Sequence, residues 1–387
     1  MKTVYLDYSA TTPLAPEVFE AMRPHFLGTY GNASSVHDFG RKAKAVLEES
    51  RETIAKALGA RHDELFFTGG GTESDNYAVR GVARAGRKRG RDQVVISAIE
   101  HHAVLHPAQA LKEEGFKVDL VPVDENGRIN LNELRRLVSA STALVSVMHA
   151  NNEVGTIQPL RAVADIAHTS GAVVHTDAVQ SAGKIPVNVD ELGIDLLSLS
   201  AHKLYGPKGI GAIYVRKGTA VEPIMLGGGQ EQNRRPGTEN VPLTAGFARA
   251  VELSMKQLEG ERARSLALRT RLKDKLLSAF EGILINGHPT DVLPTILSVS
   301  FDANKVPVDG EALIMGMDIR GVAVTSGSAC SSGTLEPSHV LMAMGRPEKT
   351  ARATIRFSIG RPTTQEDIDT AVEALREVLV PMLKPGP

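Results

Sequence analysis

The sequence predicts an α/β fold: a large domain with a mostly parallel sheet flanked by helices, and a smaller α+β domain. Between about residues 60 and 215, short β-rich runs alternate with segments of helical spacing. Apolar strands separated by helix-length crossovers form parallel sheets with helices on both faces. The length of 387 residues also exceeds that of most single domains, so two structural units are expected.

Short apolar runs in this region predict its strands, because they are rich in the residue types that sheets favour. The predicted strands are Leu65–Thr68, Val94–Ser97, Lys117–Val121, Leu144–His149, Val173–His175, Leu196–Ser200 and Ile210–Val215. Helical spacing between them predicts helices that include Asn132–Val138 and Leu160–Thr169.

A change of composition marks the end of this region. Residues 227–240, GGGQEQNRRPGTEN, are too rich in Gly and polar residues for a regular element. A long charged helix is predicted next, at Thr244–Phe280. We place the domain boundary inside that helix, so that residues 14–258 form the large domain and residues 1–13 with 259–387 form the small one. The small domain is expected to combine helices with short strands, among them Thr295–Ser300 and Ala353–Ser358.

Composition and charge narrow the class of partner. A hydrophobic share of 42% and a charged share of 23% are ordinary for a soluble protein, and a net charge of -1 gives no field to attract nucleic acid or an anionic membrane. The N-terminus has no apolar h-region, and no segment approaches the roughly 18–20 apolar residues of a membrane span. We therefore expect a cytoplasmic protein whose partner is a small molecule or another protein.

The chain contains a single cysteine, Cys330. One cysteine excludes an internal disulfide, a CxxC redox pair and a cysteine-clustered zinc or iron–sulfur site. It leaves two alternatives, an inert buried thiol or a lone nucleophile. The surrounding segment, VTSGSACSSGTLEP, is rich in Gly and Ser, which is typical of an exposed loop and favours the nucleophile.

A glycine-rich turn lies in the segment LFFTGGGTESDN, residues 65–76, between a predicted strand and a predicted helix start. Glycines let the backbone approach an anion, and a helix N-terminus offers unpaired N–H groups. The segment is not a P-loop, because no Gly-Lys-Ser/Thr follows, and Ser74 replaces the third glycine of the dinucleotide fingerprint. It is either a phosphate cradle or a tight turn before a capped helix.

Two further polar residues follow predicted strands, at the sheet edge where α/β proteins bind ligands. Asp177 either holds a cationic ring nitrogen, as pyridoxal requires, or caps the next helix, and Gln180 lies three residues on. Lys203 follows Ser200 and is a Schiff-base nucleophile only where burial lowers its pKa, whereas Lys208 is expected to be a solvated loop lysine. A phosphate cradle, an Asp and a Lys together match one cofactor, pyridoxal 5'-phosphate.

Ordered motifs run along nearly the whole chain. They are YLDYSATTP at the start, GNASSVH at 31–37, TGGGTESDN, EHHAVL at 100–105, NNEVG at 151–155, HTDAVQ, SAHKLYGPKGIGA, RRPGTEN, SGSAC at 326–330 and IRFSIGR at 355–361. In these motifs the chain resembles the cysteine desulfurases of the NifS/IscS type, which are class-V aminotransferase-like, fold-type-I pyridoxal-phosphate enzymes.

The resemblance implies a role for each matching residue. Lys203 binds the cofactor covalently, Asp177 pairs with the pyridinium nitrogen and Gln180 contacts the ring hydroxyl. His101 stacks on the ring face and moves protons together with Lys203. The resemblance further implies that the phosphate is held by Gly71, Thr72, Ser200 and His202, together with Thr238 of a second subunit. It also implies that Asn152 and Arg356 hold the carboxylate of the substrate.

The resemblance also implies the reaction and its partners. L-Cysteine gives up its sulfur to Cys330, which becomes a persulfide and leaves L-alanine, and the sulfur passes to an acceptor protein such as an iron–sulfur scaffold. Thr238 acting in trans requires a homodimer. No intrinsic metal site is expected, because the histidines of EHHAVLH lack the HExxH pattern and a nearby cysteine. In this family, however, the residue matching Cys330 can share a transferred iron–sulfur cluster with the acceptor.

Alternatives from two classes stay open. One is another fold-type-I activity, such as a selenocysteine lyase or an aminotransferase that does not need Cys330. The other is a sulfur-relay or scaffold protein whose cofactor site has decayed. Two departures from the family pattern also matter: Gly71 replaces a common alanine, and the chain stops soon after Val380 without the extension that many members use to dock a scaffold.

Overall fold

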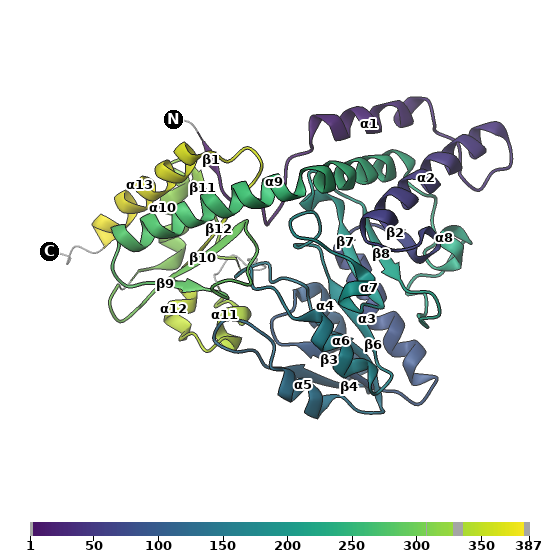
Figure 1. Cartoon of the computed structure of the whole chain (residues 1–387), viewed down its shortest axis with the longest axis horizontal. Helices are drawn as coiled ribbons and strands as arrows, with labels where there is room; N and C mark the ends of the chain where they lie inside the picture. Colours follow the sequence, from purple (N-terminus) through teal and green to yellow (C-terminus); the bar gives the residue numbers. More distant parts are fainter. Residues whose placement is uncertain (1–2, 307, 328–335, 383–387) are drawn as a thin grey trace.

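The structure is a computed structural model, and it describes residues 3–306, 308–327 and 336–382. Cys330 lies outside the described residues. The molecule has a larger lobe, mainly purple to teal in Figure 1, and a smaller lobe, mainly green and yellow. None of the described helices is both long and apolar enough to cross a membrane.

A seven-stranded sheet forms the centre of the larger lobe, in the order β2-β8-β7-β6-β5-β3-β4. The strands from β7 to β4 run parallel to their neighbours, and β8 runs antiparallel to both β7 and β2. The mostly parallel sheet is therefore confirmed. Its strands are β2 (Leu65–Thr68), β3 (Gln93–Ser97), β4 (Lys117–Val121), β5 (Thr142–Ser146), β6 (Val173–Asp177), β7 (Leu196–Ser200) and β8 (Gly211–Val215).

Helices cover both faces of this sheet, because successive strand residues point to opposite sides and both sets are apolar. Val95 and Val145 pack in a cluster with α1, α2, α6 and the first half of α9, whereas Val94 and Leu144 pack in another with α3 and α4. The helices of this lobe are α1 (Pro16–Leu27), α2 (Asp38–Ala57), η1 (His62–Glu64), α3 (Gly71–Arg87), α4 (His102–Glu113), α5 (Leu131–Leu137), α6 (Leu160–His168), α7 (Val189–Leu192), η2 (Ala201–Lys203), α8 (Gln230–Asn233) and α9 (Val241–Ala279), which extends into the smaller lobe.

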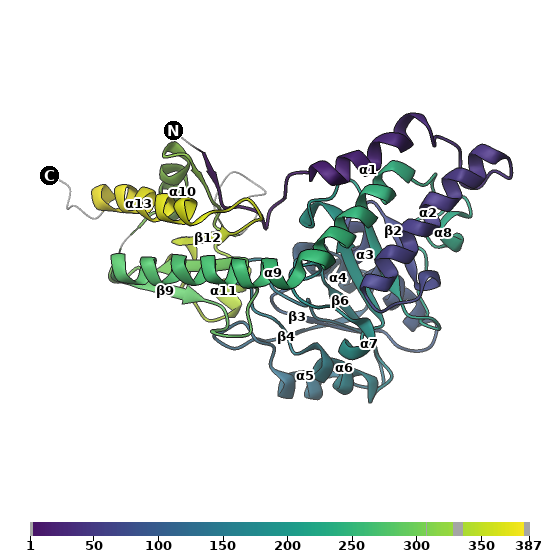
Figure 2. The same ribbon diagram turned by 45° about the horizontal axis from the view of Figure 1, so that its top comes forward.

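The smaller lobe joins both ends of the chain. Strand β1 pairs in parallel with β11, and β12-β10-β9 form an antiparallel sheet. Figure 2 shows α9 running as one rod through both lobes. The predicted boundaries of the two domains stay a prediction. The elements here are β1 (Val4–Tyr5), β9 (Ile283–Asn286), β10 (Ile296–Phe301), α10 (Gly310–Ile319), β11 (Val322–Ala323), α11 (His339–Ala343), α12 (Glu348–Arg352), β12 (Thr354–Ser358) and α13 (Gln365–Met382).

The predicted element bounds differ from the structure mainly at two places. The strand predicted at Leu144–His149 ends at Ser146, although the next residues keep single hydrogen bonds to β6, from Val147 N to His175 O and from His149 N to Asp177 O. The long helix begins three residues earlier than predicted, at Val241, because the Asn240 side chain caps it by accepting from Leu243 N.

Candidate active site

A cavity of about 380 Å³ lies at the carboxyl ends of β6 and β7. Its volume lies within the range of small-molecule sites. The cavity brings together most of the residues predicted from sequence, drawn from both lobes: Gly71, Thr72, His101, Asn152, Asp177, Gln180, Ser200, His202, Lys203 and Arg356.

Two predicted residues are not part of this arrangement. Thr238 lines a separate pocket with Arg235 and Asn240 and does not line the cavity of its own chain. Cys330 lies outside the described residues, but Gly327, three positions before it, lines the cavity. The roles predicted for Thr238 and Cys330 stay predictions.

The glycine turn forms an open helix N-terminus. Helix α3 begins at Gly71, and the preceding residue, Gly70, has a φ of 152° and provides no side-chain cap. The first N–H groups of the helix therefore remain available for an anion. A Cβ at Gly71 would lie 2.9 Å from Val179 Cγ2, so the missing side chain allows a close approach. These features favour the phosphate cradle over a side-chain-capped turn.

Asp177 is a buried carboxylate at the end of β6. Its Oδ1 accepts a hydrogen bond from Val179 N at 2.8 Å. Turns follow it in the chain, and no helix begins there for it to cap. Burial raises the pKa of Asp177 to about 6, and the nearby Lys203 acts in the opposite direction. The carboxylate is thus still ionised at neutral pH and is placed to pair with a cation.

Lys203 meets the condition set for a Schiff-base lysine. Burial is the largest effect that lowers its pKa to about 8, and Arg356 lowers it further. Its Nζ donates to Ser9 O at 2.5 Å and to Ala10 O at 2.8 Å, and both of these residues also line the cavity. The alternative lysine, Lys208, is exposed, as predicted.

Two histidines of the cavity are neutral at neutral pH, because burial and the charge of Lys203 lower the pKa of each to about 4. His101 is the N-cap of α4, and its Nδ1 accepts from Ala103 N at 3.1 Å. The proton of the neutral His101 ring is therefore on Nε2. His202 Nδ1 pairs with Thr11 Oγ1 at 3.1 Å.

Arg356 connects both lobes at the cavity. Its Nη2 forms an ion pair with Asp7 at 2.8 Å, and its Nη1 donates to Asn152 O at 2.9 Å. Its Nε is buried and has no partner among the described residues. A buried guanidinium with a free donor is suited to a carboxylate ligand.

Sequence reasoning gave no role to two acidic residues here. Asp7 contacts Arg356 across 349 positions, so no local signal pointed to the pair. Asp75 lines the cavity, and burial followed by the charge of Asp177 raises its pKa well above the ordinary value. It lies four residues after Gly71 on α3, and that spacing places both on one helix face.

Two of the three histidines of the EHHAVLH segment, His102 and His106, lie outside the cavity lining, whereas His101 lines it. The His102 and His106 rings lie 4.8 Å apart, and His339 lies 4.9 Å from His102. No group of three or more side chains that could hold a metal converges in the described part of the chain.

The donor set fits pyridoxal phosphate on three independent features. An open helix N-terminus at Gly71 and Thr72 suits a phosphate, a buried ionised carboxylate at Asp177 suits a pyridinium, and a desolvated amine at Lys203 suits an aldehyde carbon. All three line one cavity.

Comparisons with known proteins agree with this fit. The family model described as aminotransferase class-V matches residues 4–371. A cysteine desulfurase IscS of Dictyoglomus turgidum is 46% identical over 98% of this chain and 95% of its own length, and one of Methanosarcina thermophila is 45% identical over 98% and 92%. A solved NifS-like protein superposes with a TM-score of 0.90 at 39% identity, covering 98% of this chain and 99% of its own. The chain therefore belongs to the class-V aminotransferase family and, within it, to the pyridoxal-phosphate-dependent cysteine desulfurases of the NifS/IscS type.

Proposed function

We propose that this chain removes sulfur from L-cysteine through pyridoxal phosphate bound to Lys203, leaving L-alanine and a persulfide on Cys330. The observation that carries the proposal is the convergence of Lys203, Asp177, the α3 N-terminus and Arg356 on one cavity. The sulfur is then passed to an acceptor protein, such as an iron–sulfur scaffold, in the cytoplasm.

Each cofactor group has a matching set of side chains in the proposal. The first N–H groups of α3, at Gly71 and Thr72, hold the phosphate together with Ser200 and His202. Asp177 pairs with the ring nitrogen, Gln180 contacts the ring hydroxyl and His101 lies on the ring face. When bound, the cofactor supplies an electron sink for charge that develops at the substrate carbon.

The substrate is held and its protons are moved by four residues. The guanidinium of Arg356, with Asn152, binds the carboxylate of L-cysteine. The amine of Lys203 has a pKa of about 8, so it can both accept and return a proton near neutral pH. The neutral ring of His101 carries its proton on Nε2 and acts as a hydrogen-bond donor in these transfers.

Sulfur transfer is assigned to Cys330. Its thiolate attacks the substrate sulfur: a sulfur–sulfur bond forms, the carbon–sulfur bond breaks, and the electron pair stays on carbon, which takes a proton to become alanine. Gly327 lines the cavity, and three residues of extended chain reach at most about 10 Å. That reach is sufficient for a thiol at position 330 to approach the substrate.

The proposed function is tested by incubating the purified, yellow holoenzyme with L-cysteine and a reductant. We expect alanine and sulfide in equal amounts. An aminotransferase would instead give a keto acid without sulfide, and a selenocysteine lyase would prefer selenocysteine strongly over cysteine. A colourless protein that forms no product would contradict the proposal.

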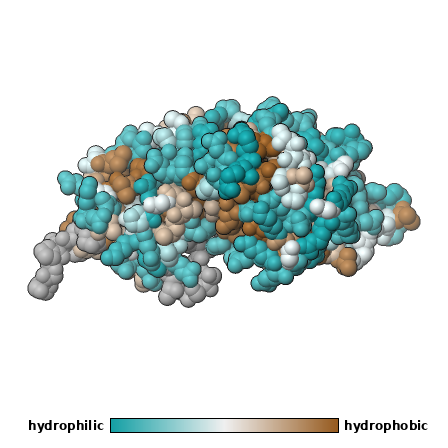
Figure 3. Space-filling view, turned by 90° about the horizontal axis from the view of Figure 1, so that it is seen from below, coloured by the Kyte–Doolittle hydropathy of each residue, from teal (hydrophilic) through white to brown (hydrophobic). Residues whose placement is uncertain are grey.

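We also propose that the chain is a homodimer and that its two domains are residues 14–258 and residues 1–13 with 259–387. Separate hydrophobic clusters support the two domains, since one contains Val18 and Phe247 and the other Leu6 and Leu272. Seen from below, the right-hand end of the molecule shows only isolated apolar side chains (Figure 3), but exposed apolar side chains of α1, the start of α2 and the segment between them support a subunit interface. They are Phe26, Leu27, Tyr30, Val36 and Phe39.

Subunit mixing tests whether Thr238 acts across that interface. Thr238→Ala should weaken cofactor binding about 10–100-fold, the scale of one hydrogen bond to a charged group. In a mixed dimer of a Lys203→Ala chain and a Thr238→Ala chain, action in trans leaves one intact site. We therefore expect one covalently attached cofactor per mixed dimer, bound with wild-type affinity. Weakened binding in the mixed dimer, or a monomeric wild-type protein, would refute the arrangement.

A further inference from the structure

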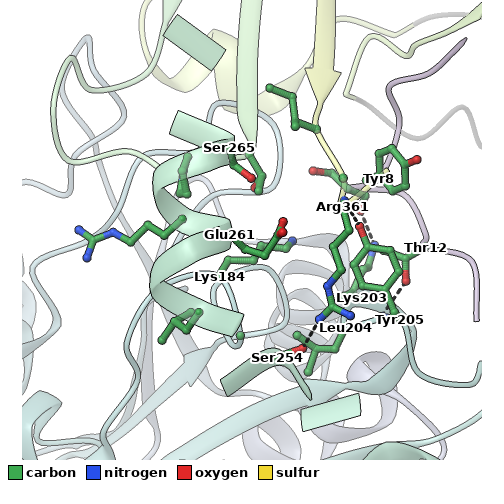
Figure 4. Close-up of a pocket in the computed structure, with 18 residues that line it drawn as sticks. Tyr8, Thr12, Lys184, Lys203, Leu204, Tyr205, Ser254, Glu261, Ser265 and Arg361 are labelled. Carbon is green, nitrogen blue, oxygen red and sulfur yellow. Dashed lines mark hydrogen bonds between the residues drawn. The ribbon is translucent and has the colours of Figure 1, made fainter. Parts of the chain in front are cut away.

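Lys184 is a half-buried lysine that the proposed mechanism does not use. It follows β6 in the chain and lines a second cavity, of about 50 Å³, which Figure 4 shows between α9 and the residues around Tyr205. Lys203 lines the same cavity. Burial is the largest effect that lowers the pKa of Lys184 to about 7, followed by the charges of Lys203 and Arg356.

Lys184 forms no ion pair within the described residues, and the carboxylate of Glu261 on α9, which lines the same cavity, pairs with Arg264 instead. Within the described residues the Lys184 Nζ has a single hydrogen-bond partner, Gln180 Oε1 at 2.9 Å. A desolvated lysine without a carboxylate partner destabilises a fold, so packing does not account for it. The second cavity has room for water molecules only, so a ligand of its own does not account for it either.

The hydrogen bonds around Gln180 determine which way its amide faces. Lys184 Nζ can only donate when charged, so the atom that it contacts must be the amide oxygen. On the other side, Gln180 Nε2 donates to Ser9 O at 2.8 Å, and a carbonyl oxygen can only accept. One hydrogen of Nε2 is used in this way, and the second is available to the cofactor cavity, which Gln180 lines.

We propose that Lys184 is a positioning residue that fixes the Gln180 amide so that it donates a hydrogen bond to the ring oxygen of the cofactor. The inference rests on the proposed contact between Gln180 and the ring hydroxyl. A donor beside that oxygen favours its ionised form. Ser9 O also accepts from Lys203 Nζ, so Lys184, Gln180 and Lys203 belong to one hydrogen-bonded network.

The pH titration of the visible absorption of the holoenzyme tests this role. Loss of a proton makes the bound chromophore more negative, and both a nearby donor and a nearby positive charge favour that form. Lys184→Met should therefore raise the titration midpoint by about one pH unit, the scale of one charge-assisted hydrogen bond. Lys184→Arg, which keeps the donor and the charge, should have a titration midpoint close to the wild-type value. Lys217→Met, at an exposed lysine that follows β8 and does not line the cavity, is the matched control and should leave the midpoint unchanged.

A double-mutant cycle with Gln180→Leu separates positioning from a direct effect of charge. If Lys184 acts through Gln180, Lys184→Met should add little to the shift that Gln180→Leu causes alone. Additive shifts, or an unchanged midpoint in both Lys184→Met and Lys184→Gln, would overturn the inference while leaving the ring contact intact. An unchanged midpoint in Gln180→Leu would instead refute the proposed contact between Gln180 and the ring oxygen.

Unfolding temperatures provide a further control. They should stay at or above the wild-type value in all variants, because loss of a lysine with a purely structural role would lower the unfolding temperature.

Discussion

Replacing Lys203 with alanine is expected to lower the rate of alanine formation from L-cysteine by at least about 10³-fold, because one amine is assigned both cofactor attachment and proton transfer. Its Nζ is held by two backbone carbonyls of the N-terminal segment, and burial lowers its pKa to about 8. The variant should bind the cofactor without covalent attachment. Borohydride reduction followed by peptide mass analysis should find the label on residue 203 of the wild type only.

The competing lysine provides the matched comparison for this experiment. Lys208 lies five residues on, and its side chain is exposed. Lys208→Ala should retain covalent attachment at residue 203. A label on residue 208, or attachment that survives in Lys203→Ala, would show that the wrong lysine was assigned.

The pKa of Lys203 also predicts how the apoenzyme captures its cofactor as pH changes. Only the neutral amine is nucleophilic, so the capture rate should rise about tenfold per pH unit below pH 8 and level off above it. An amine with the ordinary value of 10.5 would instead show a rate that continues to rise through pH 10. Stopped-flow absorbance of the apoenzyme mixed with cofactor distinguishes the two profiles.

The fold was predictable where local sequence coincides with sheet pairing. The strand at Leu196–Ser200 was predicted to the residue, since its apolar run is bounded by polar turns. The run at Leu144–His149 was predicted too long, because Val147 and Met148 are buried without lying in a strand. An apolar pattern reports burial, and burial continues past Ser146 although the pairing with β3 ends there.

Part of the site could also be predicted from local sequence. The part that could not be predicted depends on contacts between segments that are distant in the chain. Asp177 ends one apolar strand and Lys203 closely follows another, so their place at the sheet edge could be inferred from neighbouring residues. The ion pair of Asp7 with Arg356 depends on the segment after β1 meeting β12, from the opposite end of the chain, through the bridge between Asp7 and Ser358. Such a contact is fixed by tertiary packing. Strand β1 has only two residues, which is too short for a recognisable strand pattern in the sequence.

Cys330→Ala is expected to lower sulfide release by at least about 10³-fold while leaving the cofactor spectrum unchanged, since the residue is assigned sulfur acceptance and no contact with the cofactor. The chain has no other cysteine, so no second thiol can take over. Cys330→Ser should be as inactive as Cys330→Ala. Because serine has nearly the size of cysteine, that result would exclude the smaller side chain as the cause of the lost activity.

The single cysteine also makes the covalent product unambiguous. After one turnover without reductant, the wild-type peptide that contains Cys330 should gain the mass of one sulfur atom and lose it on reduction, whereas the peptide from Cys330→Ala should gain none. Alanine formed at the wild-type rate by Cys330→Ala would show that sulfur leaves the substrate without a protein nucleophile, as in a lyase. In that case the lysine would still define a pyridoxal-phosphate enzyme, but the transfer of sulfur to the protein would be refuted, because that transfer depends on the thiol alone.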